Sequence, residues 1–267
     1  MLDYGPVSLF NTFGYLHLPG FFGADEVDRL SAEFDAAVQA ASPPGDGTRT
    51  LSVPPWGAQD GLGLRLLTDE RVADIPSKVL GHGWLPLHVR CRRLADDLPW
   101  QGGGELLPWP LQHVTVAVAL DRAGPGDGCL RFVPCSHRNY LRLLEPRWQK
   151  APDYLYGLRN PKMRWDHNAL GVTDEQIPAF TTATEPGDVV VYTPDVLHAA
   201  LGVSEPRRLI EISYVAEPRT DAQLYFLRER DAGSGGAFRM PRAVAASTDP
   251  AMRDTVARWT ELGFDPA

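Results

Sequence analysis

The sequence predicts a mainly β protein with flanking helices, and three observations support this fold class. The longest apolar run, residues 114–120, is rich in β-branched side chains and is typical of a strand buried on both faces. The 25 glycines and 24 prolines show no period, which favours a turn-rich β protein over a disordered chain. Helical periodicity marks residues 24–40 and 249–263, which are expected to pack on the β core.

The N-terminal part of the chain contains a short apolar stretch, residues 13–21, which is expected to form an edge strand. Pro19 and Gly20 end it, because proline cannot continue a strand ladder. In the helix that follows, apolar residues recur on one face. Asp25 and Glu26 suit the first turn of this helix, where the helix dipole favours negative charge.

The segment before the centre of the chain is more mixed. Residues 41–61 are rich in Pro, Gly and Ser and predict a loop, and residues 62–80 carry short elements. Residues 84–94 predict a strand that carries His88 and a run of arginines. Such a run is usually the solvated face of an edge strand, although an anionic ligand there stays possible. The arginines are Arg90, Arg92 and Arg93.

The centre of the chain is organised around the apolar run. A loop rich in Gly, Trp and Pro leads into it, and a Gly126-Asp127-Gly128 turn leads to a second strand at residues 129–133. Both strands are flanked by loops that carry polar groups. We therefore expect the two strands to form a wall of an active site.

The β pattern breaks at residues 141–179, a long aromatic segment without sustained periodicity. Such an insertion predicts either a lid or a surface loop packed by its own aromatic side chains. The pattern returns at residues 185–192 and again at 209–215. Asp249-Pro250, an N-cap followed by proline, opens the last helix. Because no linker or repeat is found, residues 1–267 are predicted to form one domain.

Composition excludes several classes of function. The net charge of −8 argues against nucleic acid, because phosphate binding needs a basic face. The cysteines, Cys91, Cys129 and Cys135, lack the spacing of a zinc site or a disulfide framework. No signal peptide or 18-residue apolar run is found, so a cytoplasmic protein without a membrane partner is expected. The expected partner is a small-molecule substrate, and the oligomeric state stays open.

Four segments, in order, resemble the phytanoyl-CoA dioxygenase (PhyH) family of non-haem iron, 2-oxoglutarate-dependent oxygenases. They are residues 14–22, residues 114–121, residues 128–137 with Pro-Cys-Ser-His where Pro-Gly-Ser-His is usual, and residues 187–208. The resemblance implies a double-stranded β-helix, a cupin-like jelly roll with helices packed on one sheet.

The resemblance also implies a metal site. The family holds iron with a His-x-Asp pair and a distal histidine, and this facial triad leaves positions for 2-oxoglutarate and dioxygen. His198 matches the distal ligand. Arg207 matches the arginine that pairs with the far carboxylate of 2-oxoglutarate, and Arg208 is the fallback. Thr115, on the central strand, would contact the same co-substrate if it binds.

The chain departs from the family at the His-x-Asp pair. One alignment places Gly103, Gly104 and Glu105 there, and a second places Gln101, Gly102 and Gly103 there. Neither alignment supplies a histidine, and the second supplies no carboxylate. The sequence therefore predicts a degenerate iron site.

Other polar residues could carry chemistry in place of the lost ligands. Glu105 is either an iron ligand or a general acid/base whose pKa a dry pocket would raise. His113 is the obvious replacement ligand, yet a lone histidine there, like His88, is more often a residue of the pocket wall. Gln101 is a candidate hydrogen-bonding group, and His137 is expected to bond loop carbonyls.

Three hypotheses follow from these residues. The first is an enzyme without iron or another cofactor that cyclises or isomerises a small organic molecule through Gln101, Glu105, His113 and His198. The second is an Fe(II)/2-oxoglutarate dioxygenase with an unorthodox ligand set that includes His198 and Glu105. The third is a pseudoenzyme that binds a ligand without changing it. The first is slightly favoured over the second, because the His-x-Asp pair is missing.

Overall fold

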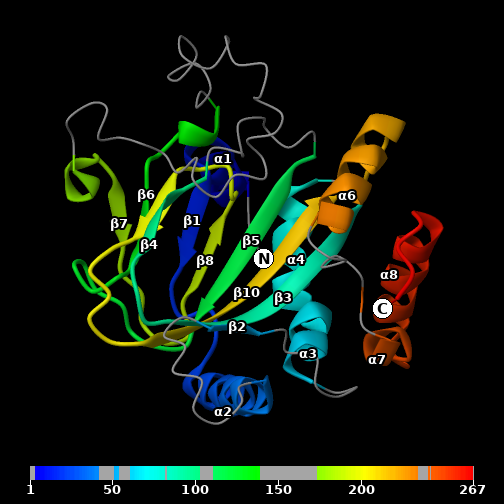
Figure 1. Cartoon of the computed structure of the whole chain (residues 1–267), viewed down its shortest axis with the longest axis horizontal. Helices are drawn as coiled ribbons and strands as arrows, with labels where there is room; N and C mark the ends of the chain where they lie inside the picture. Colours follow the sequence, from blue (N-terminus) through cyan, green and yellow to red (C-terminus); the bar gives the residue numbers. More distant parts are fainter. Residues whose placement is uncertain are drawn as a thin grey trace.

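The computed structural model describes residues 4–41, 51–53, 61–81, 83–102, 111–138, 173–233, 240 and 242–266. In this part of the chain two antiparallel sheets face each other, and helices cover the outer face of the larger sheet (Figure 1). From β3 to β10 the chain passes back and forth between the two sheets, with β6 and β7 as consecutive neighbours in the smaller sheet, as in a jelly roll. The predicted mainly β fold with flanking helices is confirmed.

The larger sheet has six strands in the order β1-β8-β5-β10-β3-β2. Its central strands bury both faces, which explains their nearly continuous apolar sequence. The strands are β1 (Tyr15–Leu18), β8 (Val189–Tyr192), β5 (His113–Ala119), β10 (Arg207–Ala216), β3 (Trp84–Leu94) and β2 (Leu51–Val53).

The smaller sheet has four strands in the order β4-β9-β6-β7. A short 3-10 helix, η4 (Asp174–Gln176), lies beside this sheet, where its Asp174 carbonyl accepts a hydrogen bond from the Trp100 indole. The strands are β4 (Leu98–Gln101), β9 (His198–Ala200), β6 (Leu130–Phe132) and β7 (Phe180–Thr182).

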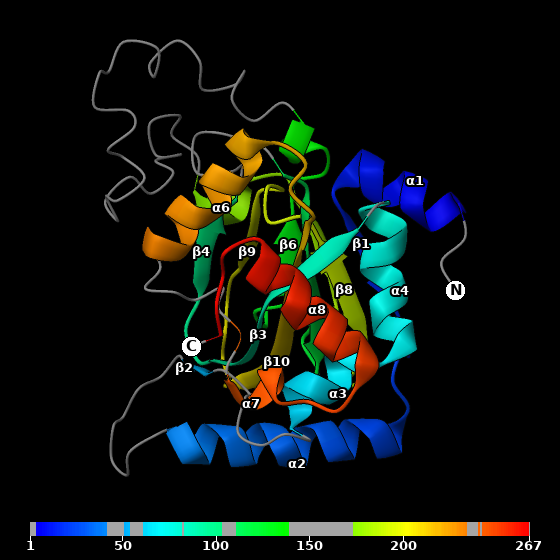
Figure 2. The same ribbon diagram turned by 90° about the vertical axis from the view of Figure 1, so that its right-hand side faces the viewer.

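The helices gather on the outer side of the larger sheet. Figure 2 shows α2 running along one edge of the molecule and α8 crossing in front of the larger sheet. None of the described helices is long and apolar enough to cross a bilayer. The helices are α1 (Tyr4–Phe13), α2 (Ala24–Ala41), α3 (Leu62–Thr68), α4 (Glu70–Val79), α6 (Asp221–Gly233), α7 (Arg242–Ala245) and α8 (Pro250–Glu261).

Most predicted elements lie where the sequence pattern puts them. The edge strand corresponds to β1, and the two periodic segments form α2 and α8. The Asp249 side chain accepts a hydrogen bond from the Met252 amide and caps α8 as expected. The helices α1 and α6 are additions that the pattern did not predict. Of the predicted lid, residues 141–179, the part 141–172 lies outside the described residues.

Strand β3 corrects the prediction of an edge strand. It pairs with β10 along its length and with β2 over its last residues, so it lies inside the sheet. Its arginines therefore point to opposite faces. Arg92 lies in a buried ion pair, whereas Arg93 is exposed. The position of β3 inside the sheet follows from its two pairing partners, and the partners of a strand are not encoded locally in the sequence.

The two faces of the larger sheet differ in chemistry. The face toward the helices is apolar and carries the core, which includes Val89, Val116 and Ile212. The opposite face, called here the inner face, points toward the smaller sheet and carries polar side chains. These are His88, Arg90, Arg92, His113, Thr115, Tyr192, Glu211 and Ser213, which share a face by their register across the ladder.

Candidate functional site

Where the two sheets approach each other, His198 opens strand β9 and faces Gln101 on β4. The two residues are ladder partners, and the Gln101 Nε2 and His198 Nε2 atoms lie 3.2 Å apart. A bulge in β4 just before Gln101 adjusts the register. Gln101 therefore lies directly opposite the candidate iron ligand, whereas Gly103, Gly104 and Glu105 of the first alignment lie outside the described residues.

The imidazole of His198 is held in one orientation. Its Nδ1 donates to the Val196 carbonyl at 2.7 Å, so the other ring nitrogen, Nε2, accepts the hydrogen bond from the Gln101 amide. Burial, together with the positive charge of Arg92, lowers the pKa of His198 to about 4. At neutral pH this imidazole is uncharged and presents a lone pair on Nε2.

Gly102 makes the close approach of β4 and β9 possible. Its φ is +104°, a conformation that side chains other than glycine rarely adopt. A Cβ atom there would lie 2.2 Å from the Val196 carbonyl oxygen, the same oxygen that orients His198. The glycine thus keeps Gln101 and His198 in register.

Aromatic rings surround His198. The ring centroid of Tyr192 lies 5.0 Å from that of His198, and that of Phe132 lies 6.1 Å away. Tyr15 stacks on Phe132 with 4.5 Å between the centroids. These rings supply an apolar wall, and their burial of the site explains why the charged form of His198 is disfavoured.

Beside this wall lies a buried ion pair that the sequence reasoning missed. The Arg92 Nη1 atom donates to both carboxylate oxygens of Glu211, at 2.9 and 3.1 Å. The Tyr192 hydroxyl donates to the Glu211 Oε1 atom at 3.4 Å. One signal was present in the sequence, because Glu211 interrupts an apolar strand at a position that shares its face with Ser213.

Further along the inner face, two histidines are uncharged at neutral pH. Burial and the charges of Arg90 and Arg92 lower the pKa of His88 to about 3. Burial, with Arg230 contributing, lowers the pKa of His113 to about 3. Between these histidines and the ion pair, the hydroxyl oxygens of Thr115 and Ser213 lie 3.1 Å apart.

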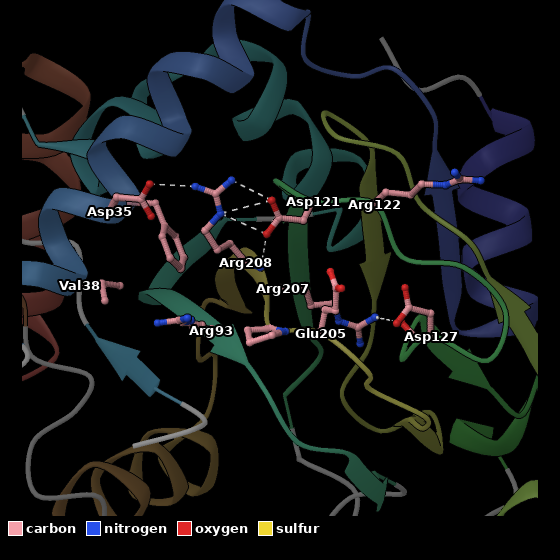
Figure 3. A pocket seen from close by; sticks show the side chains of 11 residues that line it. Asp35, Val38, Arg93, Asp121, Arg122, Asp127, Glu205, Arg207 and Arg208 are labelled. Carbon is pink, nitrogen blue, oxygen red and sulfur yellow. Dashed lines mark hydrogen bonds and ion pairs between the residues drawn. The ribbon is translucent and has the colours of Figure 1, made fainter. Parts of the chain in front are cut away.

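The two C-terminal arginine candidates lie on opposite sides of β10. Arg207 is buried; its Nη1 donates to the Asp127 carbonyl at 3.1 Å, and its Nε has no partner among the described residues. Arg208 points outward, where its guanidinium contacts Asp121 at 2.8 Å and Asp35 at 2.9 Å (Figure 3). Of the two, Arg207 is therefore the one with a donor left for a ligand.

The pocket drawn in Figure 3 is separate from the inner face. It has a volume of about 600 Å³ and lies at the outer end of β10, next to α2. Its lining holds four acidic and four basic side chains, and Arg208 is paired with Asp35 and Asp121. Arg207 also lines this pocket, whereas Gln101, His198 and Glu211 do not.

The described residues do not fit an iron facial triad. They contain no group of three or more His, Cys, Asp or Glu side chains that could hold a metal ion. His198 has the ligand's orientation, because metal-binding imidazoles usually donate their second nitrogen to a carbonyl or carboxylate. Its ladder partner is an amide, and Glu105 lies outside the described residues.

Known proteins resemble the part of the chain that carries these features. The family model described as phytanoyl-CoA dioxygenase (PhyH) matches residues 92–209, which include Gln101, His198 and Arg207. The ectoine dioxygenase of Stutzerimonas stutzeri is 25% identical over 237 residues, covering 78% of this chain and 74% of the relative. The predicted resemblance to the PhyH-like Fe(II)/2-oxoglutarate oxygenases is confirmed.

Solved structures support the same fold. HygX from Streptomyces hygroscopicus, solved with nickel and 2-oxoglutarate bound, has a TM-score of 0.63 and 21% identity, with 83% of this chain and 90% of HygX covered. SnoN, a non-haem α-ketoglutarate-dependent epimerase from nogalamycin biosynthesis, has a TM-score of 0.52 and 21% identity, with 79% and 81% covered. The ectoine dioxygenase and SnoN are both enzymes, which agrees with the expectation that this chain is an enzyme.

Proposed function

We propose that this PhyH-like chain is an enzyme that rearranges a small organic molecule, by isomerisation or cyclisation, without an iron facial triad. The observation that carries the proposal is the pairing of Gln101 with His198. In the second alignment this neutral amide takes the place of the histidine of the His-x-Asp pair. Amide groups are weak ligands for iron compared with imidazole and carboxylate.

The ion pair between Arg92 and Glu211 supports the same proposal. The resemblance puts a cationic co-substrate contact near Arg92 or Arg93, and Arg92 is the one that points inward. Its guanidinium is already bound to a carboxylate of the protein. An internal carboxylate therefore competes with any 2-oxoglutarate carboxylate for this arginine.

The proposed reaction moves a proton between two positions of the bound molecule. His198 Nε2 accepts the proton after the substrate displaces the Gln101 amide from this nitrogen, and returns it at the second position; Nδ1 stays bonded to the Val196 carbonyl throughout. Tyr192 stays protonated, because burial and the Glu211 carboxylate raise its pKa well above 10, so its hydroxyl serves as a hydrogen-bond donor. Gln101 orients the substrate. Glu105 and His113 remain predicted participants.

A second candidate function is an Fe(II)/2-oxoglutarate dioxygenase, and one observation favours it. Arg207 is buried with an unpartnered Nε, as an arginine that awaits a ligand carboxylate would be. The orientation of His198 suits a metal ligand as well. In this alternative Glu105 would supply the carboxylate, Thr115 would contact the co-substrate, and the third ligand would be unorthodox.

The test is an anaerobic Fe(II) titration of metal-stripped protein by calorimetry, with and without 2-oxoglutarate. We expect no saturable one-to-one iron binding by the wild-type protein. The Gln101→His variant restores a second imidazole opposite His198 and should bind iron at least tenfold more tightly than wild type.

The matched control is Gln101→His combined with His198→Ala, which removes the partner imidazole and should lose the gained affinity. The proposal is wrong if wild-type protein binds one iron per chain, 2-oxoglutarate tightens that binding, and turnover forms succinate. Such a result would establish the dioxygenase and make Glu105 the next residue to change.

A further inference from the structure

The inner face of the larger sheet carries one arginine that the proposed chemistry does not use. Arg90 lies on β3, directly across the ladder from Glu211 on β10. Its side chain is partly buried, and burial lowers its pKa. No hydrogen bond or ion pair joins Arg90 to any of the described residues, although the charge of Glu211 acts on it.

Glu211 does not satisfy Arg90, because its oxygens are engaged elsewhere. Both oxygens accept from Arg92, and Oε1 also lies within 3.4 Å of the Tyr192 hydroxyl. A guanidinium offers five donors in a planar fork. The donors of Arg90 point to the inner face, which also carries Tyr192, and they are available to a ligand.

The charge of the inner face decides which ligand fits. Arg92 and Glu211 neutralise each other. Burial lowers the pKa of His88, two residues before Arg90 on β3, to about 3, so this histidine is uncharged at neutral pH. Next to the ion pair Arg90 therefore leaves one net positive charge, whereas Arg207, the other arginine on this side of β10, lies four positions before Glu211, at the start of the strand. A half-buried charge without a counter-ion is costly.

We infer that the substrate carries a single carboxylate and that Arg90 binds it through a bidentate pair. A carboxylate matches both the charge and the planar fork of the guanidinium. A phosphate monoester carries about −1.5 to −2 at neutral pH and would leave an uncompensated negative charge. A neutral molecule would leave Arg90 without a counter-ion. This inference deepens the proposed function, because it names the substrate class of the same site.

The experiment uses three probes of the same shape and different charge, namely benzoate, phenyl phosphate and benzamide. Their dissociation constants are measured by calorimetry at pH 7 with the full chain as wild type, Arg90→Gln and Arg93→Gln. Arg93→Gln is the matched control, because Arg93 is the neighbour on the same strand but is exposed on the other face.

Wild type and Arg93→Gln should bind benzoate with the same affinity and should prefer it to both other probes. Arg90→Gln should bind benzoate at least tenfold more weakly and should no longer distinguish it from benzamide. Equal benzoate affinity in wild type and Arg90→Gln would overturn the inference. So would a tighter phenyl phosphate complex, an equal loss in Arg93→Gln, or no benzoate binding by wild type.

A second variant keeps the inference testable if Arg90→Gln does not fold. Glu211→Gln frees Arg92 and adds one positive charge to the inner face, so it should shift preference from benzoate toward phenyl phosphate; an unchanged preference would count against the charge argument. Iron binding coupled to succinate formation would disprove the proposed isomerase function, but it would not change these binding results. Loss of the Arg90 effect alone would remove only the carboxylate assignment.

Discussion

At the scale of single residues, Cys135 has the most unusual backbone. Its φ is +66°, the only positive value among the described residues other than glycine, and it lies in the Pro-Cys-Ser-His turn. The left-handed conformation costs an L-residue about 1–2 kcal/mol. The turn is nevertheless fixed, because the Cys135 amide donates to the Phe13 carbonyl at 3.1 Å and the Ser136 hydroxyl binds the Leu197 amide at 2.8 Å.

We predict that Cys135→Gly stabilises the fold by up to about 1 kcal/mol, because relief of the strained φ exceeds the extra entropy of the unfolded chain. The free energy of unfolding in urea measures this. Cys135→Ala is the control, since it removes the thiol but keeps a Cβ and should bring no gain. Equal stabilisation by both variants would show that the thiol, and not the backbone, sets the effect.

At the scale of elements, the junction of β4 and β9 holds the candidate site. Strand pairing places Gln101 opposite His198, and Gly102 lets the Val196 carbonyl approach β4. The order of the two strands in the sheet, not their order in the chain, creates this contact, because 97 residues separate the two side chains.

We predict that Gly102→Ala lowers the free energy of unfolding by about 1–3 kcal/mol, through strain at a positive φ and the clash with Val196. The displaced carbonyl should also release His198 Nδ1, which the ring ¹⁵N chemical shifts of His198 would report. Gly124→Ala is the control, since a Cβ at Gly124 meets nothing within 4 Å. Unchanged stability and unchanged His198 shifts in Gly102→Ala would contradict the role given to Gly102.

At the scale of the whole molecule, three buried histidines link stability to pH. His88, His113 and His198 have folded-state pKa values of about 3, 3 and 4, below the ordinary value of 6.5. The unfolded chain therefore binds protons that the folded chain does not. Their contribution to stability is present above pH 6.5 and is lost as the pH falls toward the folded-state values.

We predict that the free energy of unfolding decreases from pH 6.5 to pH 4.5, with each buried histidine contributing a slope of up to about 1.4 kcal/mol per pH unit. Denaturant titrations at several pH values measure the slope. His88→Gln should reduce this slope by the contribution of one histidine, whereas His17→Gln changes an exposed histidine on β1 and serves as the comparison. A flat profile over this range would show that the three rings titrate in the folded state.

The sequence by itself determined the features that depend on local pattern and on recognisable motifs. Apolar runs predicted β5, β8 and β10, periodic stripes predicted α2 and α8, and Asp249-Pro250 marked a helix start. The motifs around His198 and Arg207 carried the resemblance to the PhyH family, and the family model matches the part of the chain that contains both residues. The sequence also predicted a degenerate His-x-Asp pair, and this stays a prediction.

Only the tertiary structure decided what these side chains meet. Two alignments of the glycine-rich loop were open, and the ladder places Gln101 opposite His198. The sequence left open which arginines of β3 face the site. The pairing of β3 with β10 and β2 shows that Arg90 and Arg92 point inward and Arg93 points outward. Glu211 is part of the site through its ion pair with Arg92, which lies 119 positions away in the sequence. The physical reason is that burial and charge pairing depend on strand neighbours, and those are set by how the two sheets pack.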